Sequence, residues 1–120
     1  MKINFKYSNL QEEWKELLIV NPKLVQVGLL VAARFGDSTI THIYRTQTQQ
    51  HQFYPNEPNK TSVHQLWRGL DFSIRGISSD IQKEVVAEVN NKFPYGKDGI
   101  NTAMIHNVGS GIHLHLQTIK

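Results

Sequence analysis

The stretch Thr61-Ser-Val-His-Gln-Leu-Trp-Arg-Gly-Leu-Asp-Phe72, read together with the later His113-Leu-His115, organises this chain. The first segment places Asp71 seven residues after His64. In an extended segment, residues two apart point to the same side. The two histidines of the second segment therefore face one cavity, while the leucines beside them face the opposite layer.

Imidazole and carboxylate groups are ligands that zinc prefers, and three protein ligands leave its fourth position open for water. The chain has no cysteine, which excludes disulfides and thiolate zinc sites, so His, Asp or Glu must hold any metal. We therefore predict one catalytic zinc site that draws on His64, Asp71 and the His113/His115 pair.

Length and composition indicate a soluble protein with a single domain, residues 1–120. No apolar run reaches membrane-spanning length, so no membrane insertion is expected. The N-terminus lacks the apolar region of a secretory signal, which predicts a protein that is cytoplasmic as synthesised. The net charge of +3 is scattered. No basic face interleaved with aromatic residues is visible, so a nucleic-acid partner is not expected.

Local patterns predict an α+β fold with a small antiparallel sheet and helices packed on one side. Helices are expected over 10–18, capped by Ser8 or Asn9, over 22–35, ending at Gly36, and over 80–92, capped by Ser78 or Ser79. Strands are expected over 38–44, 69–74, 102–108 and 112–119. Residues 46–60 are polar and are predicted to form a long loop.

The last two strands are predicted to form a hairpin that turns on Ser110-Gly111. In that register His106 lies opposite His115, and both share a face with His113. A slip by one residue would move His106 to the leucine face. We interpret His51, in the polar loop, as a surface residue, while His42, inside a strand, is either structural or a support for the metal site.

The chain also reads Thr41-His-Ile-Tyr-Arg45, a polar loop, Ser62-Val-His64, Gly69-Leu-Asp71 and finally His113-Leu-His115. This combination resembles the zinc-dependent D,D-carboxypeptidase/endopeptidase family within the lysostaphin, D-Ala-D-Ala peptidase and hedgehog superfamily. The matched segments cover roughly residues 38 to 118 of the sequence. The resemblance implies a hedgehog/D,D-peptidase-like fold with Zn2+ held by His64, Asp71 and His115.

The same resemblance implies that Arg45 contacts the substrate carboxylate or a nearby carbonyl, and that Ser62 lies beside the substrate. A surface charge at a strand end is the simpler interpretation of Arg45. The family usually has a glycine near residues 66–67, ahead of an Arg-Ala pair, whereas this chain reads Trp67-Arg68-Gly69. Arg68 is expected to be a structural or substrate-binding group, and Trp67 to wall the substrate groove or to pack in the fold.

The family's usual catalytic glutamate would stand three residues before the last ligand. That position is Ile112, and no acidic residue follows Asp98. The branch with a His-x-His pair uses the first histidine beside the zinc water, which implies His113, or His106, as general base.

The implied activity is cleavage of peptidoglycan stem or cross-link peptides by a monomer, released at lysis or carried on a virion. One alternative is a zinc-binding module of the same fold that has lost hydrolysis and binds cell wall or serves a phage structure. Another is a cupin-like oxygenase site with two histidines and a carboxylate. Cupins place the His-x-His pair before the later ligands, whereas here it comes last.

Overall fold

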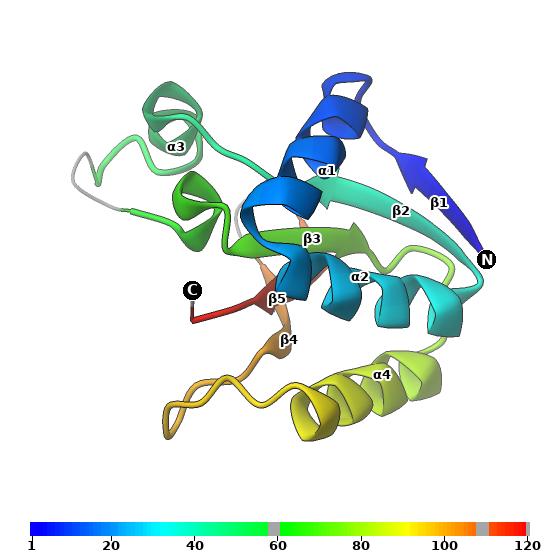
Figure 1. The fold of residues 1–120 in the computed structure, drawn as a ribbon. Coiled ribbons are helices and arrows are strands. Elements are labelled where there is room, and N and C mark those ends of the chain that lie inside the picture. Colours follow the sequence, from blue (N-terminus) through cyan, green and yellow to red (C-terminus); the bar gives the residue numbers. More distant parts are fainter. Residues whose placement is uncertain (58–60, 108–110, 120) are drawn as a thin grey trace.

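The protein is described by a computed structural model that covers residues 1–57, 61–107 and 111–119. Within these ranges the chain folds as an α+β structure with a five-stranded mixed sheet, in the order β1-β2-β3-β5-β4, and four α-helices (Figure 1). The strands are β1 Lys2–Phe5, β2 Asp37–His42, β3 Gly69–Ser73, β4 Ala103–Asn107 and β5 Ile112–Gln117. The helices are α1 Asn9–Val20, α2 Pro22–Phe35, α3 Gln47–Phe53 and α4 Ser79–Lys92, with a short 3-10 helix, η1 Val63–Leu66, before β3.

Strand pairing confirms an antiparallel arrangement for four of the described strands. The pairs β2–β3, β3–β5 and β4–β5 all run antiparallel. The prediction omitted β1, which pairs parallel with β2 and makes the sheet mixed. Four residues give too short an alternation for a strand to stand out from the sequence.

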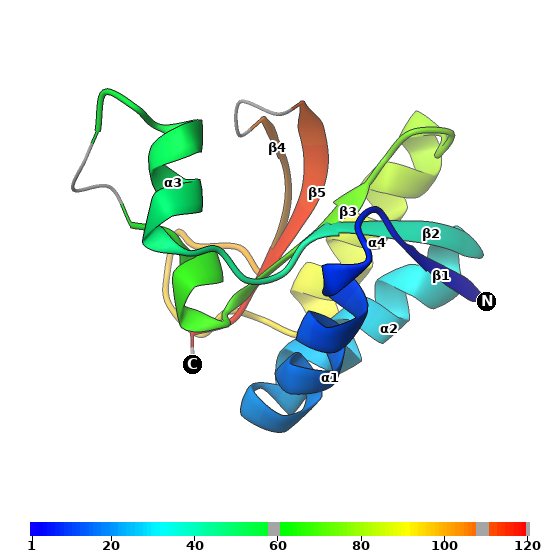
Figure 2. The same cartoon turned by 90° about the horizontal axis from the view of Figure 1, so that it is seen from above.

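Helices α1, α2 and α4 cover one face of the sheet, as predicted, while α3 lies apart from them beyond β2 (Figure 2). The buried stripe expected on α2, including Leu24, Val27 and Val31, packs here. A Cβ on Gly28 would come 2.7 Å from Cδ2 of Leu70, so this glycine lets α2 approach β3 closely. In the part of the chain that the structure describes, no helix has the length and apolar character to cross a bilayer.

The register of β4 against β5 differs from the predicted one by two residues. His106 lies opposite His113, and Met104 lies opposite His115. The prediction that His106 faces His115 directly was therefore wrong. Because a shift of two keeps every side chain on its face, His106 and the His113/His115 pair still share one side of the sheet. The predicted turn at Ser110-Gly111 involves residue 110, which lies outside the described residues.

The prediction that residues 46–60 form a long loop was wrong over Gln47–Phe53, which form the helix α3. Residues 58–60 of this segment lie outside the described ranges. The hydroxyl of Thr46 accepts from the backbone N–H of Gln49, and the Gln49 side chain accepts from the Thr46 N–H. This reciprocal capping box begins a helix in a segment without an apolar stripe.

Asn21, at the junction of α1 and α2, joins three parts of the fold. Its side-chain oxygen accepts from the Leu24 N–H and begins α2. Its amide nitrogen donates to the Trp67 carbonyl at 3.0 Å and to the Thr118 hydroxyl at 2.8 Å. The helical layer is thereby connected to the end of η1 and to the chain after β5.

We predict that Asn21→Ala lowers the free energy of unfolding by about 2–3 kcal/mol, because it removes a helix cap and two further hydrogen bonds of a buried side chain. Urea unfolding measures the change. Asn91→Ala, at an exposed position of α4, is the control and should change the free energy by less than about 0.5 kcal/mol. Equal effects of the two substitutions would contradict the role given to Asn21.

Candidate metal centre

The site is centred on Asp71, a carboxylate on β3 that has no exposed surface. Strand pairing places His115 of β5 directly opposite it on one side and His42 of β2 on the other. His115 Nδ1 lies 2.7 Å from Asp71 Oδ1, and His42 Nδ1 lies 3.5 Å from Oδ2. The sheet alone therefore brings two imidazoles to one buried carboxylate.

His64 reaches the same carboxylate from η1, with its Nε2 3.2 Å from Asp71 Oδ2. Ser62 caps this 3-10 helix, since its hydroxyl accepts from the His64 N–H at 3.2 Å. Gly69 lies directly behind the ring: a Cβ there would come 2.8 Å from Val63 Cγ2 and 3.0 Å from His64 Nδ1. A glycine at this position lets the His64 ring lie against the start of β3.

The hydrogen-bond partner of His64 determines which ring nitrogen carries the proton. Nδ1 lies 2.9 Å from the Ile43 carbonyl oxygen, which can only accept, so Nδ1 is the donor. In a neutral ring, Nε2 then presents its lone pair to Asp71. Metal-binding histidines typically donate their outer N–H to a carbonyl or carboxylate in this way.

His115 is oriented by an equivalent contact on its outer side. Its Nε2 lies 3.2 Å from Oε1 of Gln117, while the Gln117 amide nitrogen donates to the Asn101 carbonyl at 2.9 Å. That donation fixes the orientation of the amide and turns its oxygen toward the ring, so Nε2 of His115 is the donor. A neutral His115 therefore presents the lone pair of Nδ1 to Asp71.

Three electron-rich groups thus converge with no hydrogen left between them when both rings are neutral. Oδ2 of Asp71 is buried and accepts no hydrogen bond from the described residues. Acceptors that face one another at these distances repel unless a positive charge lies between them. The arrangement calls for a cation, supplied either by protons on the imidazoles or by a metal ion.

The donor set fits a metal ion. One ligand atom from each of His64, Asp71 and His115 lies within 4.8 Å of the other two, and all three residues are buried. A tetrahedral ion with bonds of about 2.0–2.1 Å holds its ligand atoms about 3.3 Å apart, close to the 3.2 Å between His64 Nε2 and Asp71 Oδ2. This buried cluster could hold a metal ion, as the sequence predicted.

Burial alone would raise the pKa of Asp71. With protons as the cation, the positive charge of His64 and the hydrogen bonds that His115 and His64 then donate outweigh that effect and hold the pKa of this carboxyl well below its usual range. Burial lowers the pKa of His42 to about 4, against an opposing attraction from Asp71. His42 is therefore neutral at neutral pH and does not compete with a metal ion for the charge of Asp71.

A pocket of about 250 Å³ lies beside the cluster. His64 and His115 line it together with His106 and two residues from the α3 side, Arg45 and Gln50. Arg45 is 3% exposed and donates from Nη1 to Gln50 Oε1 at 2.9 Å. Burial lowers the pKa of Arg45, and attraction to Asp71 opposes that shift. Because Arg45 is buried, its interpretation as a surface charge at a strand end was wrong.

The two candidate general bases lie in different places. His106 lines this pocket, and its ring centroid is 5.2 Å from that of His115. Burial, aided by His115, lowers the pKa of His106. His113 instead packs edge-on against His42, with centroids 5.4 Å apart, and its Nδ1 donates to the Gly111 carbonyl.

Ser62 lines the pocket as well as capping η1. Trp67 and Arg68, the other two predicted substrate contacts, interact with the fold itself. Trp67 stacks on Tyr44 with ring centroids 4.7 Å apart. Arg68 donates from Nη1 to the Ile119 carbonyl at 2.8 Å. Their proposed contact with substrate stays a prediction.

Two glutamines of the site were not found from the sequence. Gln117 orients His115, and a signal for it existed, since it follows that histidine by two residues and shares its strand face. Gln50 is 1% exposed, and its Nε2 has no hydrogen-bond partner among the described residues. No sequence pattern pointed to Gln50, because its segment was interpreted as a loop.

No family model, no curated protein and no solved structure matches this chain. The family resemblance therefore depends on the quoted sequence motifs alone.

Protein purified without a His-tag is expected to contain about one divalent metal ion per chain, because the cluster lacks only a cation. Asp71→Ala should lose the ion, since it removes the carboxylate that the other ligands face. His51→Ala, a histidine substitution outside the cluster, is the control and should keep it. Elemental analysis measures all three proteins, and an equally low metal content in each would exclude the site.

Proposed function

We propose that this protein is a zinc-dependent peptidase that cleaves peptidoglycan stem or cross-link peptides, as a D,D- or L,D-type carboxypeptidase or endopeptidase. The observation that carries the proposal is the convergence of His64, Asp71 and His115 with both outer imidazole nitrogens already engaged. From the motif resemblance we further propose that the fold is hedgehog/D,D-peptidase-like. We also propose that the protein is a monomer that is released at lysis or associated with a virion.

Zinc is the metal that this donor set favours. Two imidazoles and one carboxylate are borderline ligands, typical of a catalytic zinc ion that keeps one position for water. Hard ions such as Mg²⁺ and Ca²⁺ prefer sites made mainly of oxygen ligands. When bound, zinc supplies an activated water and polarises the scissile carbonyl.

His106 is the better placed of the two candidate general bases. It lines the same pocket as His64 and His115, whereas His113 lines a different cavity on the same face of the sheet. Its lowered pKa leaves the ring neutral near pH 7, so it can accept a proton from the attacking water and pass it to the leaving amine.

Arg45 and Gln50 form the end of the pocket that suits a carboxylate. The guanidinium contributes charge and a planar pair of donors, which a lysine lacks. Gln50 Oε1 accepts from Arg45, which turns the Gln50 amide N–H groups away from that contact and leaves them to donate. A substrate carboxylate bound here would leave the preceding peptide bond near the metal centre.

One observation favours the alternative, a zinc-binding module without hydrolysis that binds cell wall or serves a phage structure. The residues that line the pocket include no aspartate or glutamate. A carboxylate is a common general base in metal-dependent hydrolysis, so an imidazole must replace it here if the protein is an enzyme.

We expect zinc-loaded protein to hydrolyse a peptide that ends in D-Ala-D-Ala, and His106→Ala to reduce kcat by about 10²–10⁴-fold with zinc content unchanged. Loss of the proton acceptor slows the chemical step without removing a ligand. Single-turnover hydrolysis and elemental analysis measure the two effects, with His51→Ala as control. If His113→Ala removes activity and His106→Ala does not, the assignment of the base is wrong. If wild type with a full zinc content shows no hydrolysis, the module is supported instead.

Arg45→Lys should reduce kcat/KM by about 10–100-fold for a substrate with a free C-terminal carboxylate, because a point charge cannot replace two parallel hydrogen bonds. The same peptide with a C-terminal carboxamide should be affected much less. Arg34→Lys, on α2 and paired with Glu88, is the matched control. Equal losses for both peptides would show that Arg45 does not recognise the carboxylate.

A further inference from the structure

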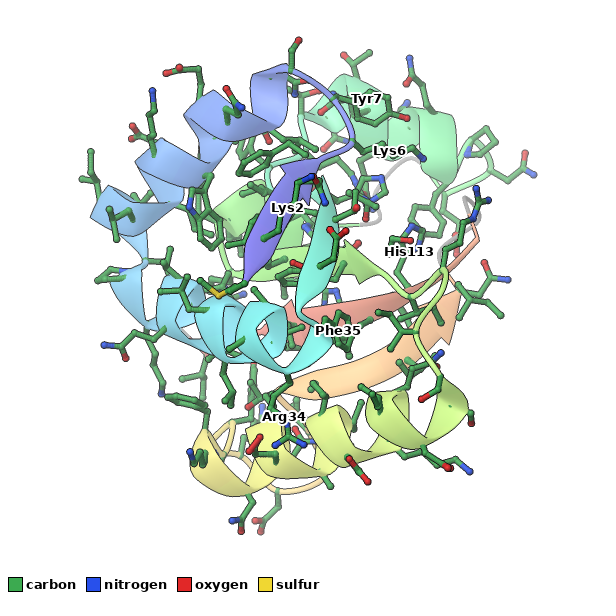
Figure 3. The ribbon with its side chains drawn as sticks, turned by 90° about the vertical axis from the view of Figure 1, so that its right-hand side faces the viewer. Lys2, Lys6, Tyr7, Arg34, Phe35 and His113 are labelled. Atoms are coloured by element: carbon green, nitrogen blue, oxygen red, sulfur yellow. The ribbon has the colours of Figure 1, made fainter. Side chains whose placement is uncertain are left out.

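A second cavity, of about 710 Å³, continues the strand face of the metal centre. Its floor consists of Thr39 and Thr41 of β2, Ser73 of β3 and His113 of β5, and Lys6 and Arg75 lie at its rim. Lys6 and His113 lie on the same side of the molecule (Figure 3). We call this cavity the anion groove.

The position of the anion groove follows from the strand register. Ser73 pairs with His113 just as Asp71 pairs with His115, two residues away along the same strands. Two residues of strand cover about 7 Å and return to the same face. The pocket with Arg45 includes Gln117 and His115, while the anion groove takes in 111–113, so the two cavities lie toward opposite ends of β5.

The charges of the anion groove are of one sign. Lys6 and Arg75 are exposed, and neither forms an ion pair with any described residue. The Lys6 ammonium lies 5.4 Å from the centroid of the Tyr7 ring. The lining residues include no aspartate or glutamate, and the hydroxyls of Thr39 and Ser73 can donate, while that of Thr41 donates to the Asp71 carbonyl. Two uncompensated cations above a hydroxyl-lined floor suit an anionic ligand.

We propose that the anion groove binds an acidic residue of an extended peptide substrate, on the N-terminal side of the scissile bond. This inference rests on the proposed function. With the C-terminal carboxylate at Arg45 and the scissile bond at the metal centre, the rest of the peptide extends toward Ser73 and His113. The substrate class is thereby narrowed to peptides with a carboxylate two or more residues before the cleaved bond.

The test compares two peptides, acetyl-Glu-Ala-D-Ala-D-Ala and acetyl-Gln-Ala-D-Ala-D-Ala, which differ only in one charge. Wild type should prefer the Glu peptide by about fivefold in kcat/KM at low salt, as two exposed cations allow. The double variant Lys6→Gln/Arg75→Gln should bring the ratio of the two values close to one. Lys2→Gln, a lysine of β1 outside the groove, is the control and should keep the ratio.

Calorimetric titration of both peptides separates this inference from the proposed function. Tighter binding of the Glu peptide, lost in the double variant but without hydrolysis of either peptide, supports the anion groove and contradicts the peptidase. Hydrolysis of both peptides at equal kcat/KM by wild type supports the peptidase and overturns the anion groove. A preference that the double variant retains also overturns it.

Discussion

A carboxylate without access to water, that of Asp71, is the constraint on which the rest of the site depends. Burying an unpaired charge is costly, and a buried carboxylate persists only where opposite charge or hydrogen bonds compensate it. Here the compensation comes from imidazoles on three separate elements: η1, β2 and β5. When these rings are neutral, the compensation is complete only if a cation is also present.

The alternation of β3 and β5 lets one pair of strands serve both the core and the site. Leu70 and Phe72 of β3, with the leucines of β5, face the helical layer and are fully buried. Asp71 and His115, which alternate with these core residues along the two strands, face the opposite side of the sheet. Packing against α2 therefore fixes the strands that carry two of the three residues of the candidate metal cluster, so the hydrophobic core holds the site in position.

The sequence was informative wherever the period of a pattern matched the structure. Alternation placed the histidines of β5 on one face, and the helical stripe predicted α2, because burial on one side imposes these periods. The register of β4 on β5 was two residues off, since it depends on a turn whose geometry composition does not determine. Each side chain still lies on its predicted face, because the burial of one face of each strand excludes a shift by one residue.

The sequence analysis missed the elements that have no regular spacing of apolar residues. β1 is too short to show alternation, and α3 has no apolar stripe, although Thr46 and Gln49 do have the spacing of a capping box. Gln50 and its contact with Arg45 depend on that helix. The prediction therefore found the three residues of the candidate metal cluster, which lie on regular strands or within a recognisable motif, and missed part of the pocket that surrounds them.

The three residues of the candidate metal cluster differ in how firmly the fold holds them, which bears on how the site forms. Asp71 and His115 belong to neighbouring strands in a continuous ladder of backbone hydrogen bonds. His64 lies on a 3-10 helix of four residues, held by the Ser62 cap, the Ile43 carbonyl and the space left by Gly69. A short helix with few backbone bonds opens more readily than a sheet. A metal ion that joins His64 to Asp71 would therefore stabilise η1 most, and with it the boundary of the pocket that contains Ser62.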